Sequence, residues 1–458
     1  MLMTFNEAAA LPGFELLPGA ESGMENRGFD SVCVDSREIV PGALFVALPG
    51  EKTDGHAFVK DAFAAGAAGA LVERAKRETY GLTEAAREAG KSLVLARDTL
   101  RGLQALAAAY LDRFPAMLKV GITGSSGKTT TKELAAAMIG AERSVVFNGG
   151  NLNSDSGLPL SVFHVRSGHE VGIFEMGMNR KGEIAELAAV LRPDIALITN
   201  TGSAHIGMIG SERGIALEKR AVFSRFTGKE LALLPEGGAF SELLAEELNG
   251  RLKFFGKTSS KKFGGAESRG LFGSTVVWDG ESVNFALPGE HNLMNALAAA
   301  ALADAAGVSG EAVRAGLAGA KPLFGRGEVI AGEFTVLRDC YNANPDSMDK
   351  AISLCDEADW DGRRVYIIGS MLELGDGGEA AHEALGERLA ESKADIIFLF
   401  GEETKASCAK LKDTKNKFVF HTNSIDDLRS KTRENIRKGD MILLKGSRAC
   451  ALERVMPV

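Results

Sequence analysis

A glycine-rich segment that ends in lysine and threonine is the clearest chemical signal in the sequence. It reads GITGSSGKTT over residues 121–130, between an apolar run and a helical pattern. Backbone N–H groups of such a loop can surround phosphate oxygens, while Lys128 can reach the β- and γ-phosphates of a nucleotide and Thr129 can bind Mg²⁺. We therefore predict an ATP-binding loop, with an ordinary glycine-rich turn as the alternative. Its candidate residues are Gly124, Ser125, Ser126, Gly127, Lys128, Thr129 and Thr130.

Two further segments place candidate metal ligands at strand ends. Glu175 lies in the apolar run VGIFEM at 171–176, and His205 follows the run DIALITN at 194–200. A carboxylate and a neutral imidazole suit divalent cations, and functional groups gather at the carboxyl ends of buried parallel strands. Taken alone, His205 is more simply explained as an ordinary loop histidine. Lys219 lies on an expected helix among mixed charges, where composition alone indicates a solvated lysine.

Two polar clusters later in the chain could contact a nucleotide. His291, Asn292 and Asn295 stand at the start of an alanine-rich helical pattern, where Asn292 could either cap the helix or bind the nucleotide. The run DCYNANPDS at 339–347 follows a strand-like segment. A structural turn explains its Asn-Pro-Asp-Ser part, whereas Asp339 at the strand end could bind a ribose hydroxyl.

An α/β fold in three domains would position these groups. Residues 1–98 predict a small N-terminal α/β unit, with two short strand-like runs in 31–48 and an alanine-rich helical pattern over 61–73. Residues 99–320 predict a central, mostly parallel sheet of the P-loop ATPase type. Residues 321–458 predict a doubly wound, Rossmann-like sheet. The turn-rich stretch that begins the last domain reads as a joint between domains.

Continuous apolar runs separated by helical patterns are the basis of this division. Such runs are typical of parallel strands buried on both faces, and the helical patterns between them imply right-handed crossovers. The expected strands are 117–123, 171–176, 194–200, 334–341, 363–370, 395–403 and 440–447, and the expected helices include 99–114, 128–139 and 292–307.

Length, charge and cysteine content narrow the class of protein. The 458 residues suggest about three domains at ~150 residues each, and 45% are hydrophobic. A net charge of −8, with no long basic tract, argues against a nucleic-acid binder. No apolar run reaches the length of a membrane span and no leader pattern is present, so we expect a cytoplasmic protein. The five scattered cysteines include no Cys-x-x-Cys pair and predict neither disulfides nor a zinc site.

These clusters, in this order, resemble the Mur ligases, the ATP-dependent amide-forming enzymes of peptidoglycan precursor synthesis. The resemblance spans essentially the whole chain. It includes the loop at 121–130, the segments GNLNSDSGLPL, EMGMNRKGEI, ITNTGSAH and GEHNLMNALAAA, the arginine of FGRGE and the final LLKGSRA. In the N-terminal unit, DSREIVPGALFVALPGEKTDGHAF looks like the stretch that holds a uridine nucleotide. The residues on that pattern are Asp35, Ser36, Arg37, Asp54, Gly55 and His56.

The resemblance implies a ligase that uses ATP and two Mg²⁺ ions. Thr129, Glu175, His205 and Lys219 fall on the metal-binding positions, with Lys219 carbamylated so that its charge is reversed. His291, Asn292, Asn295, Arg326 and Asp339 fall on further ATP-contacting positions. Lys128, Glu175, His205, Lys219 and Arg326 are the catalytic set. The implied substrate-binding residues are Ser36, Arg37, Asp54, His56, Asn151, Asn153, Tyr341, Asn342, Asn344 and Ser347.

Two features favour the branch of the family that joins D-alanyl-D-alanine to UDP-N-acetylmuramoyl-tripeptide. The run Tyr-Asn-Ala-Asn-Pro-Asp-Ser is typical of that branch, and the Asp-Asn-Pro-Arg motif of the diaminopimelate-adding relative is absent. The C-terminal domain would close over ATP and bind the incoming dipeptide. We expect a monomer that binds these two substrates, no nucleic acid and no membrane. Ser154 and Arg338 depart from the family pattern, in which Asn and Asp are usual.

Three other functions stay open at this point. A related ligase could add a single amino acid, or act like a folylpolyglutamate synthase. A P-loop ATPase could use ATP to move a partner without forming a bond. A catalytically silent protein could bind a UDP-sugar alone, although the joint presence of the candidate ATP and metal residues argues against it.

Overall fold

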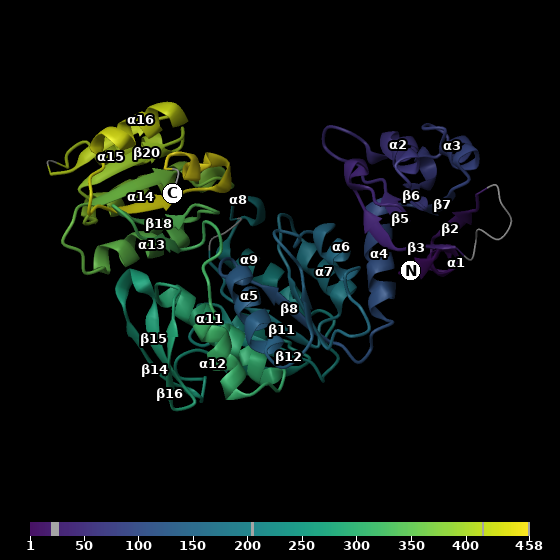
Figure 1. Cartoon of the computed structure of the whole chain (residues 1–458), viewed down its shortest axis with the longest axis horizontal. Helices are drawn as coiled ribbons and strands as arrows, with labels where there is room; N and C mark the ends of the chain where they lie inside the picture. Colours follow the sequence, from purple (N-terminus) through teal and green to yellow (C-terminus); the bar gives the residue numbers. More distant parts are fainter. Residues whose placement is uncertain (20–26, 203–205, 415, 457–458) are drawn as a thin grey trace. The chain divides into compact units, whose positions relative to one another are not determined.

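The computed structural model describes residues 1–19, 27–202, 206–414 and 416–456 (Figure 1). The chain divides into two compact units. The first comprises Met1–Gly121, Ser144–Met178 and Glu183–Pro193, and the second comprises Ile122–Arg143, Asn179–Gly182 and Asp194–Val458. None of the described helices is both long and apolar enough to cross a membrane. All five cysteines lie in described segments and carry free thiols.

The N-terminal part of the first unit is a five-stranded sheet. Its order is β2 (Glu15–Leu17), β7 (Ser92–Ala96), β6 (Gly69–Glu73), β5 (Ala43–Val46) and β4 (Ser31–Cys33). The last four strands run parallel and β2 is an antiparallel edge. Helices α2 (Val59–Ala64) and α3 (Leu82–Ala89) supply Val59 and Leu82 to the core against Phe45 and Leu93. This is the α/β unit that the sequence predicts.

The helix expected over residues 61–73 is wrong in its second half. Helix α2 ends at Ala64, Gly66 takes the left-handed φ of +103°, and residues 69–73 form strand β6 between β5 and β7. Gly69 is required by close packing, because a Cβ there would lie 2.6 Å from the ring of Phe5. A strand that needs small residues because its neighbours lie close can therefore be mistaken for part of an alanine-rich helix in the sequence.

A six-stranded sheet carries the glycine-rich loop. Its order is β13 (Arg251–Phe255), β12 (Leu231–Pro235), β11 (Ile195–Ile198), β8 (Leu118–Thr123), β10 (Val171–Glu175) and β9 (Val145–Phe147). Strand β9 pairs with β10, β11 with β12 and β12 with β13, each in parallel. In the second unit, α5 (Lys128–Gly140) packs against α11 (Glu290–Ala305) and α12 (Gly310–Ala318). In the first, α4 (Thr99–Leu111) packs against α6 (Gly157–Val162) and α7 (Glu183–Leu191).

A small antiparallel sheet in the second unit was not predicted. It consists of β14 (Phe263–Ser268), β15 (Ser274–Trp278) and β16 (Glu281–Phe285), in that order. Figure 1 shows it beside α12, against which β16 packs. Its turn carries Leu271, which is 3% exposed and belongs to a core cluster with Met348 and Ile352.

The C-terminal part of the second unit is the doubly wound sheet that the sequence predicts. Its order is β17 (Glu328–Ile330), β18 (Thr335–Asp339), β22 (Met441–Lys445), β19 (Arg364–Gly369), β20 (Ile396–Phe400) and β21 (Phe418–Thr422). All of its strands except β17 run parallel.

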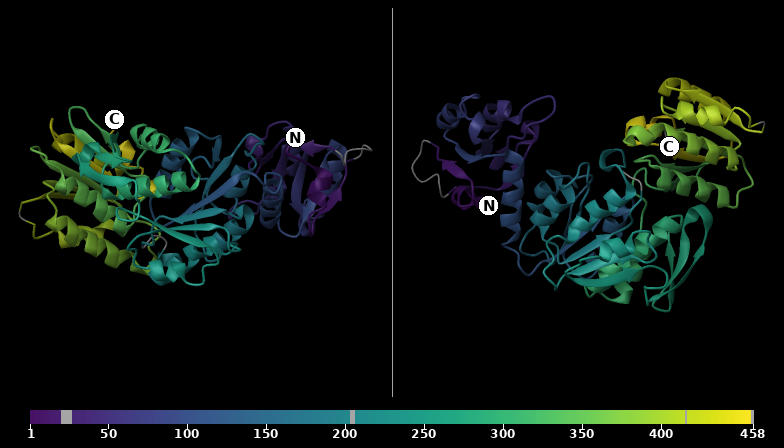
Figure 2. Two further views of the ribbon diagram at one scale, coloured as in Figure 1. Left: turned by 90° about the horizontal axis from the view of Figure 1, so that it is seen from below. Right: turned by 180° about the vertical axis from the view of Figure 1, so that it is seen from behind.

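Alternate residues of these strands enter two separate cores. Tyr366 and Ile368 belong to the core that contains α13 (Pro345–Glu357) and α14 (Gly378–Glu391), whereas Val365 and Ile367 belong to the core that contains α16 (Ile425–Asn435). Both faces are therefore covered, as Figures 1 and 2 show, and this explains why the strands read as continuous apolar runs.

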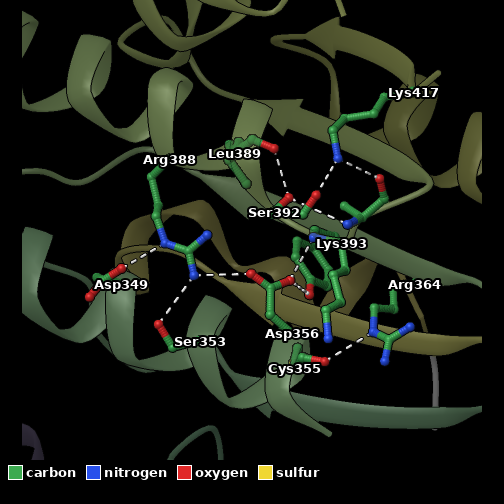
Figure 3. A network of polar contacts seen from close by, with 12 residues as sticks. Asp349, Ser353, Cys355, Asp356, Arg364, Arg388, Leu389, Ser392, Lys393 and Lys417 are labelled. Atoms are coloured by element: carbon green, nitrogen blue, oxygen red, sulfur yellow. Dashed lines mark hydrogen bonds and ion pairs between the residues drawn. The ribbon is translucent and has the colours of Figure 1, made fainter. Parts of the chain in front are cut away.

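A polar network lies beside the first of these cores (Figure 3). Asp356 of α13 accepts hydrogen bonds from the hydroxyl of Tyr366 (2.7 Å) and the backbone N–H of Lys393 (2.8 Å), and it pairs with Arg388 of α14 (3.0 Å). Arg388 also pairs with the exposed Asp349 at 2.8 Å. Because Asp356 and Tyr366 are buried, each needs the other as a hydrogen-bond partner when the two helices pack on the sheet.

Candidate active site

The glycine-rich loop makes a tight turn that leads directly into helix α5. Gly127 is the N-cap of α5 and takes a φ of +78°, and a Cβ there would lie 2.2 Å from Oδ1 of Asn295. A Cβ on Gly124 would lie 1.8 Å from Oγ1 of Thr199. Lys128 Nζ donates to the carbonyl of Gly124 at 2.8 Å, across the loop. The position of Lys128 favours a binding loop over an ordinary glycine-rich turn, because this lysine stands at the positive, N-terminal end of a long helix.

The segment after β11 holds the loop in place. Ser125 Oγ donates to the carbonyl of Gly202 at 2.8 Å, and the backbone N–H of Ser126 donates to Asn200 Oδ1 at 3.0 Å. The hydroxyl of Thr199 donates to the carbonyl of Ser126 at 2.6 Å. Sequence reasoning did not single out Thr199 or Asn200, although the polar end of the run DIALITN was the available signal. His205, the expected metal ligand of this segment, lies outside the described residues.

Lys219 is buried, contrary to what its composition alone indicates. It lies on α9 (Glu212–Arg220) and is 1% exposed. Burial lowers the pKa of its ammonium well below the usual range, the positive charge of Lys128 lowers it further, and Glu218 opposes the shift. Burial therefore favours the neutral amine, the form that has the lone pair a nucleophile needs.

Glu175 stands at the end of β10, where two asparagines fix it. It is 3% exposed, and Asn153 Nδ2 donates to its Oε1 at 2.7 Å. The amide of Asn148 pairs with the backbone of Glu175 in both directions, at 2.8 and 3.0 Å. The sequence analysis expected Asn153 to contact the substrate and did not mark Asn148. Asn151 is exposed, and Ser154 accepts a bond from the N–H of Gly157 at 3.1 Å, so the departure from Asn keeps a polar contact.

The start of α11 brings His291, Asn292 and Asn295 together. The N-cap is Gly289, so the alternative that Asn292 caps the helix is wrong. Asn292 donates instead to the carbonyl of Pro288 at 2.8 Å, and Asn295 Nδ2 donates to Asn292 Oδ1 at 3.3 Å. Burial lowers the pKa of His291 to about 4, against the opposing charge of Asp339, so its imidazole is neutral at pH 7.

The predicted cluster after β18 divides into a part around Asp339 and Tyr341 and a helix-capping part. Asp339 pairs with Lys445 at 2.8 Å, and the guanidinium of Arg326 lies 4.0 Å from the centre of the Tyr341 ring. Asn344 and Ser347 form a capping box at the start of α13, with Pro345 in its first turn. This is the structural turn held as an alternative for Asn-Pro-Asp-Ser. Asn342 Oδ1 accepts from the N–H of Ala343 at 2.8 Å.

Arg338, which replaces an acidic residue of the family pattern, has a partner of its own. It stands opposite Glu328 in the β17–β18 register and pairs with it at 2.7 Å. Its guanidinium also lies 4.5 Å from the ring centre of Phe324. The reversed charge is therefore neutralised across the strand pair.

The N-terminal candidates form a connected polar group. Asp54 Oδ1 accepts from His56 Nδ1 at 2.6 Å, while its Oδ2 pairs with Lys76 at 2.8 Å and accepts from the hydroxyl of Tyr80 at 3.3 Å. His56 is 1% exposed, and its Nε2 accepts from the N–H of Glu73 at 2.8 Å. Burial alone would raise the pKa of Asp54, but the bonds from Lys76 and His56 outweigh it and hold that pKa well below the usual range.

Asp35, Ser36 and Arg37 form a short turn in the same sheet's loops. Asp35 accepts from the backbone N–H of Arg37 at 3.0 Å and pairs with its guanidinium at 2.5 Å. The hydrogen bond from Arg37 lowers the pKa of Asp35 to about 2. The Arg37 side chain is 86% exposed, so its donors remain accessible to an anion.

The described residues hold no cluster of three or more His, Cys, Asp or Glu side chains arranged for a metal. The expected ligand set includes His205, which is not described, and a lysine that becomes an oxygen ligand only after carbamylation.

Comparison with known proteins places the chain in a family. Residues 29–110 match "Mur ligase family, catalytic domain", residues 122–303 match "Mur ligase middle domain", and residues 325–448 match "Mur ligase, glutamate ligase domain". A UDP-N-acetylmuramoyl-tripeptide–D-alanyl-D-alanine ligase from Treponema pallidum is 40% identical, over 100% of this chain and 99% of its own.

Solved structures agree with these matches. MurF from Acinetobacter baumannii superposes with a TM-score of 0.83 at 29% identity, over 93% of this chain and 92% of its own. MurF ligase from Thermotoga maritima, in complex with ADP, gives 0.78 at 27% identity, over 93% and 96%. The chain belongs to the Mur ligase family.

Proposed function

We propose that this protein joins D-alanyl-D-alanine to UDP-N-acetylmuramoyl-tripeptide at the expense of ATP, forming the pentapeptide precursor of peptidoglycan. The observation that carries the proposal is the full-length similarity to ligases of that name. The loop at 121–130 supports the matching ATP chemistry, since its glycines allow a tight turn against Thr199 and Asn295 and its lysine stands at the helix start.

The reaction has two bond-forming steps. The terminal carboxylate of the tripeptide attacks the γ-phosphorus of ATP, which gives an acyl phosphate and ADP. The amine of D-alanyl-D-alanine then attacks the acyl carbon, and the tetrahedral intermediate loses phosphate and a proton to give the amide. Protein groups contribute mainly position and charge to phosphoryl transfer. We assign that work to Lys128 and Arg326, with His291, Asn292, Asn295 and Asp339 binding the nucleotide.

Mg²⁺ is part of this proposal. Thr129 and Glu175 each present a buried oxygen, the donor type that Mg²⁺ prefers. We assign the ligands of two ions to Thr129, Glu175, His205 and carbamylated Lys219. When bound, the ions would neutralise phosphate charge.

The environment of Lys219 supports its carbamylation. A neutral amine adds CO₂ and releases one proton, which leaves a carbamate with one negative charge. Burial and Lys128 both favour the neutral amine. The product would replace a repulsion between Lys219 and Lys128 by an attraction, and it would supply oxygen ligands where an ammonium has none.

The remaining assignments follow the predicted domains. We assign residues 1–98, with Ser36, Arg37, Asp54 and His56, to the uridine nucleotide, and residues 99–320 to ATP and the metal. Residues 321–458 would close over ATP and bind D-alanyl-D-alanine through Tyr341, Asn342, Asn344 and Ser347, and Asn151 and Asn153 would contact the tripeptide substrate. Because His56, Asn344 and Ser347 are also bonded to protein groups, they would in addition hold the shape of the loops that contact these substrates. A cytoplasmic, monomeric enzyme remains our prediction.

One assay tests the proposal against its alternatives. Phosphate release is followed with ATP, Mg²⁺ and UDP-muramoyl-tripeptides that end in diaminopimelate, lysine or ornithine, each with D-alanyl-D-alanine, with D-alanine or with glutamate. We expect turnover only with the dipeptide, and none in Lys128→Ala. Turnover without an amine acceptor would indicate an ATPase, and turnover with a single amino acid would indicate a related ligase.

A further inference from the structure

A buried lysine that the reaction does not yet use lies at the end of β22. Lys445 is 2% exposed, and its ammonium contacts two groups of the neighbouring strand and loop. Its Nζ lies 2.8 Å from Asp339 Oδ2 and donates to the carbonyl of Asn342 at 2.9 Å. Sequence reasoning did not mark it, because a lysine in the run DMILLKGS gives no sign of its partners.

Strand register sets this pair. Asp339 and Lys445 are direct partners in the parallel β18–β22 ladder, so both side chains leave the sheet at its carboxyl edge and on the same face. The Asp339 side chain remains 23% exposed, whereas that of Lys445 is almost closed off from water. The carboxylate can thus reach a ligand while the lysine cannot.

The lysine connects two candidate binding elements. One N–H is directed to Asp339 and another to the backbone of Asn342, in the loop that also carries Tyr341. The charges of Asp339 and Lys445 both act on His291 at the start of α11. The pair therefore lies close to the segment assigned to the nucleotide.

A buried ammonium is costly unless it is paired and hydrogen-bonded. A methionine would fill the same space without that cost, so packing alone does not explain a lysine here. Without the ammonium, Asp339 would lose its ion partner and the carbonyl of Asn342 would lose a donor. A carboxylate without that anchor can take several rotamers, and misplacement of a contact by about 1 Å can cost up to ~100-fold in rate.

We propose that Lys445 is a positioning residue that orients Asp339 for a ribose hydroxyl of ATP and fixes the loop at Asn342. This inference rests on the proposed contact between Asp339 and ATP. Lys445 itself touches neither ATP nor the reacting atoms.

The test compares Lys445→Met, Lys445→Gln, Asp339→Asn and the double variant Lys445→Met/Asp339→Asn. Each variant is assayed with ATP, 2′-deoxy-ATP and 3′-deoxy-ATP in the full-length enzyme, and its thermal unfolding is recorded. Lys417→Met is the matched control, because Lys417 also donates to backbone carbonyls, those of Ser392 and Ala394 between α14 and β20, but lies in the network of Figure 3. Lys445→Gln keeps an N–H donor in case the methionine variant does not fold.

We expect Lys445→Met to raise KM for ATP at least tenfold with a smaller change in kcat. It should also reduce the discrimination against the deoxy analogue that lacks the contacted hydroxyl. Lys445→Gln should lie between it and the wild type, and Lys417→Met should stay within twofold. In the Asp339→Asn background, Lys445→Met should add less than twofold.

Two outcomes would overturn the inference, and they are distinguishable. If Asp339→Asn raises KM for ATP but neither Lys445 variant does, Asp339 binds ATP without help from Lys445. If Asp339→Asn itself leaves KM unchanged, the proposed contact with ATP is wrong, and the role of Lys445 is lost with it.

Discussion

Gly127→Ala tests whether the loop geometry determines ATP affinity. Two costs follow from the structure. At the φ of +78°, an L-residue is strained by roughly 1–2 kcal/mol. The new Cβ would also lie 2.2 Å from Oδ1 and 3.0 Å from Cγ of Asn295, closer than atoms approach, so Asn295 must move. Because Asn295 is buried and bonded to Asn292, displacing it costs about 1 kcal/mol more.

The sum, about 2–3 kcal/mol, corresponds to a loss of ATP affinity of about 30- to 150-fold. Titration calorimetry with ATP measures it directly, and KM for ATP in the phosphate-release assay gives a second value. Gly140→Ala is the matched control at the other end of α5. A Cβ there meets nothing within 4 Å, so affinity should stay within twofold.

A second pair of variants separates the two costs. Placing Gly127→Ala on top of Asn295→Ala removes the collision but keeps the backbone strain. The added loss should then fall to about 5- to 30-fold, the strain alone. The reasoning is refuted if Gly127→Ala binds ATP within twofold of wild type, or if Gly140→Ala weakens binding as strongly.

Three further predictions concern other parts of the molecule. Lys219→Ala should lose activity and regain part of it with added short-chain carboxylic acids, and absence of rescue would count against the carbamate. The depressed pKa of Asp54 contributes stability that is present above its unfolded pKa and lost as the pH falls below about 4, so Asp54→Asn should show a smaller drop in unfolding temperature between pH 7 and pH 3. Asp356→Ala should lower stability by about 3–5 kcal/mol, since it leaves a buried tyrosine hydroxyl and Arg388 without this partner. In the matched control, Asp349→Ala removes the exposed partner of Arg388 and should lower the free energy of unfolding, measured in urea, by less than about 1 kcal/mol.

Sequence reasoning recovered β8, β10, β11, β18, β19, β20 and β22, because continuous apolar runs identify them directly, but it did not mark the equally buried β7 and β12. It missed β21 and the sheet of β14 to β16, whose strands expose part of their length and mix polar residues with apolar ones. It misassigned Gly69–Glu73 because small residues required by packing share their composition with helices.

The candidate site shows the same limit. The loop at 121–130 and the strand-end Glu175 carry local signals, and the structure places both where strands end. Thr199, Asn148 and Lys445 act through tertiary hydrogen bonds and strand register, which a single sequence does not display. The burial of Lys219 likewise depends on how α9 packs, because the sequence of α9 alone indicates a surface helix.

Because Asp339 pairs directly with Lys445, this edge of the sheet depends more on the length of β22 than on its side-chain composition. Many substitutions of one apolar residue for another along β22 would leave the register between β18 and β22 unchanged. Deletion of one residue within the strand would turn Lys445 to the opposite face and bring Gly446, which has no side chain, opposite the carboxylate, whereas an insertion would bring Leu444 there. Natural and engineered variants of this domain should therefore tolerate changes of side chain in β22 far better than insertions or deletions, and length variation should be confined to the loops.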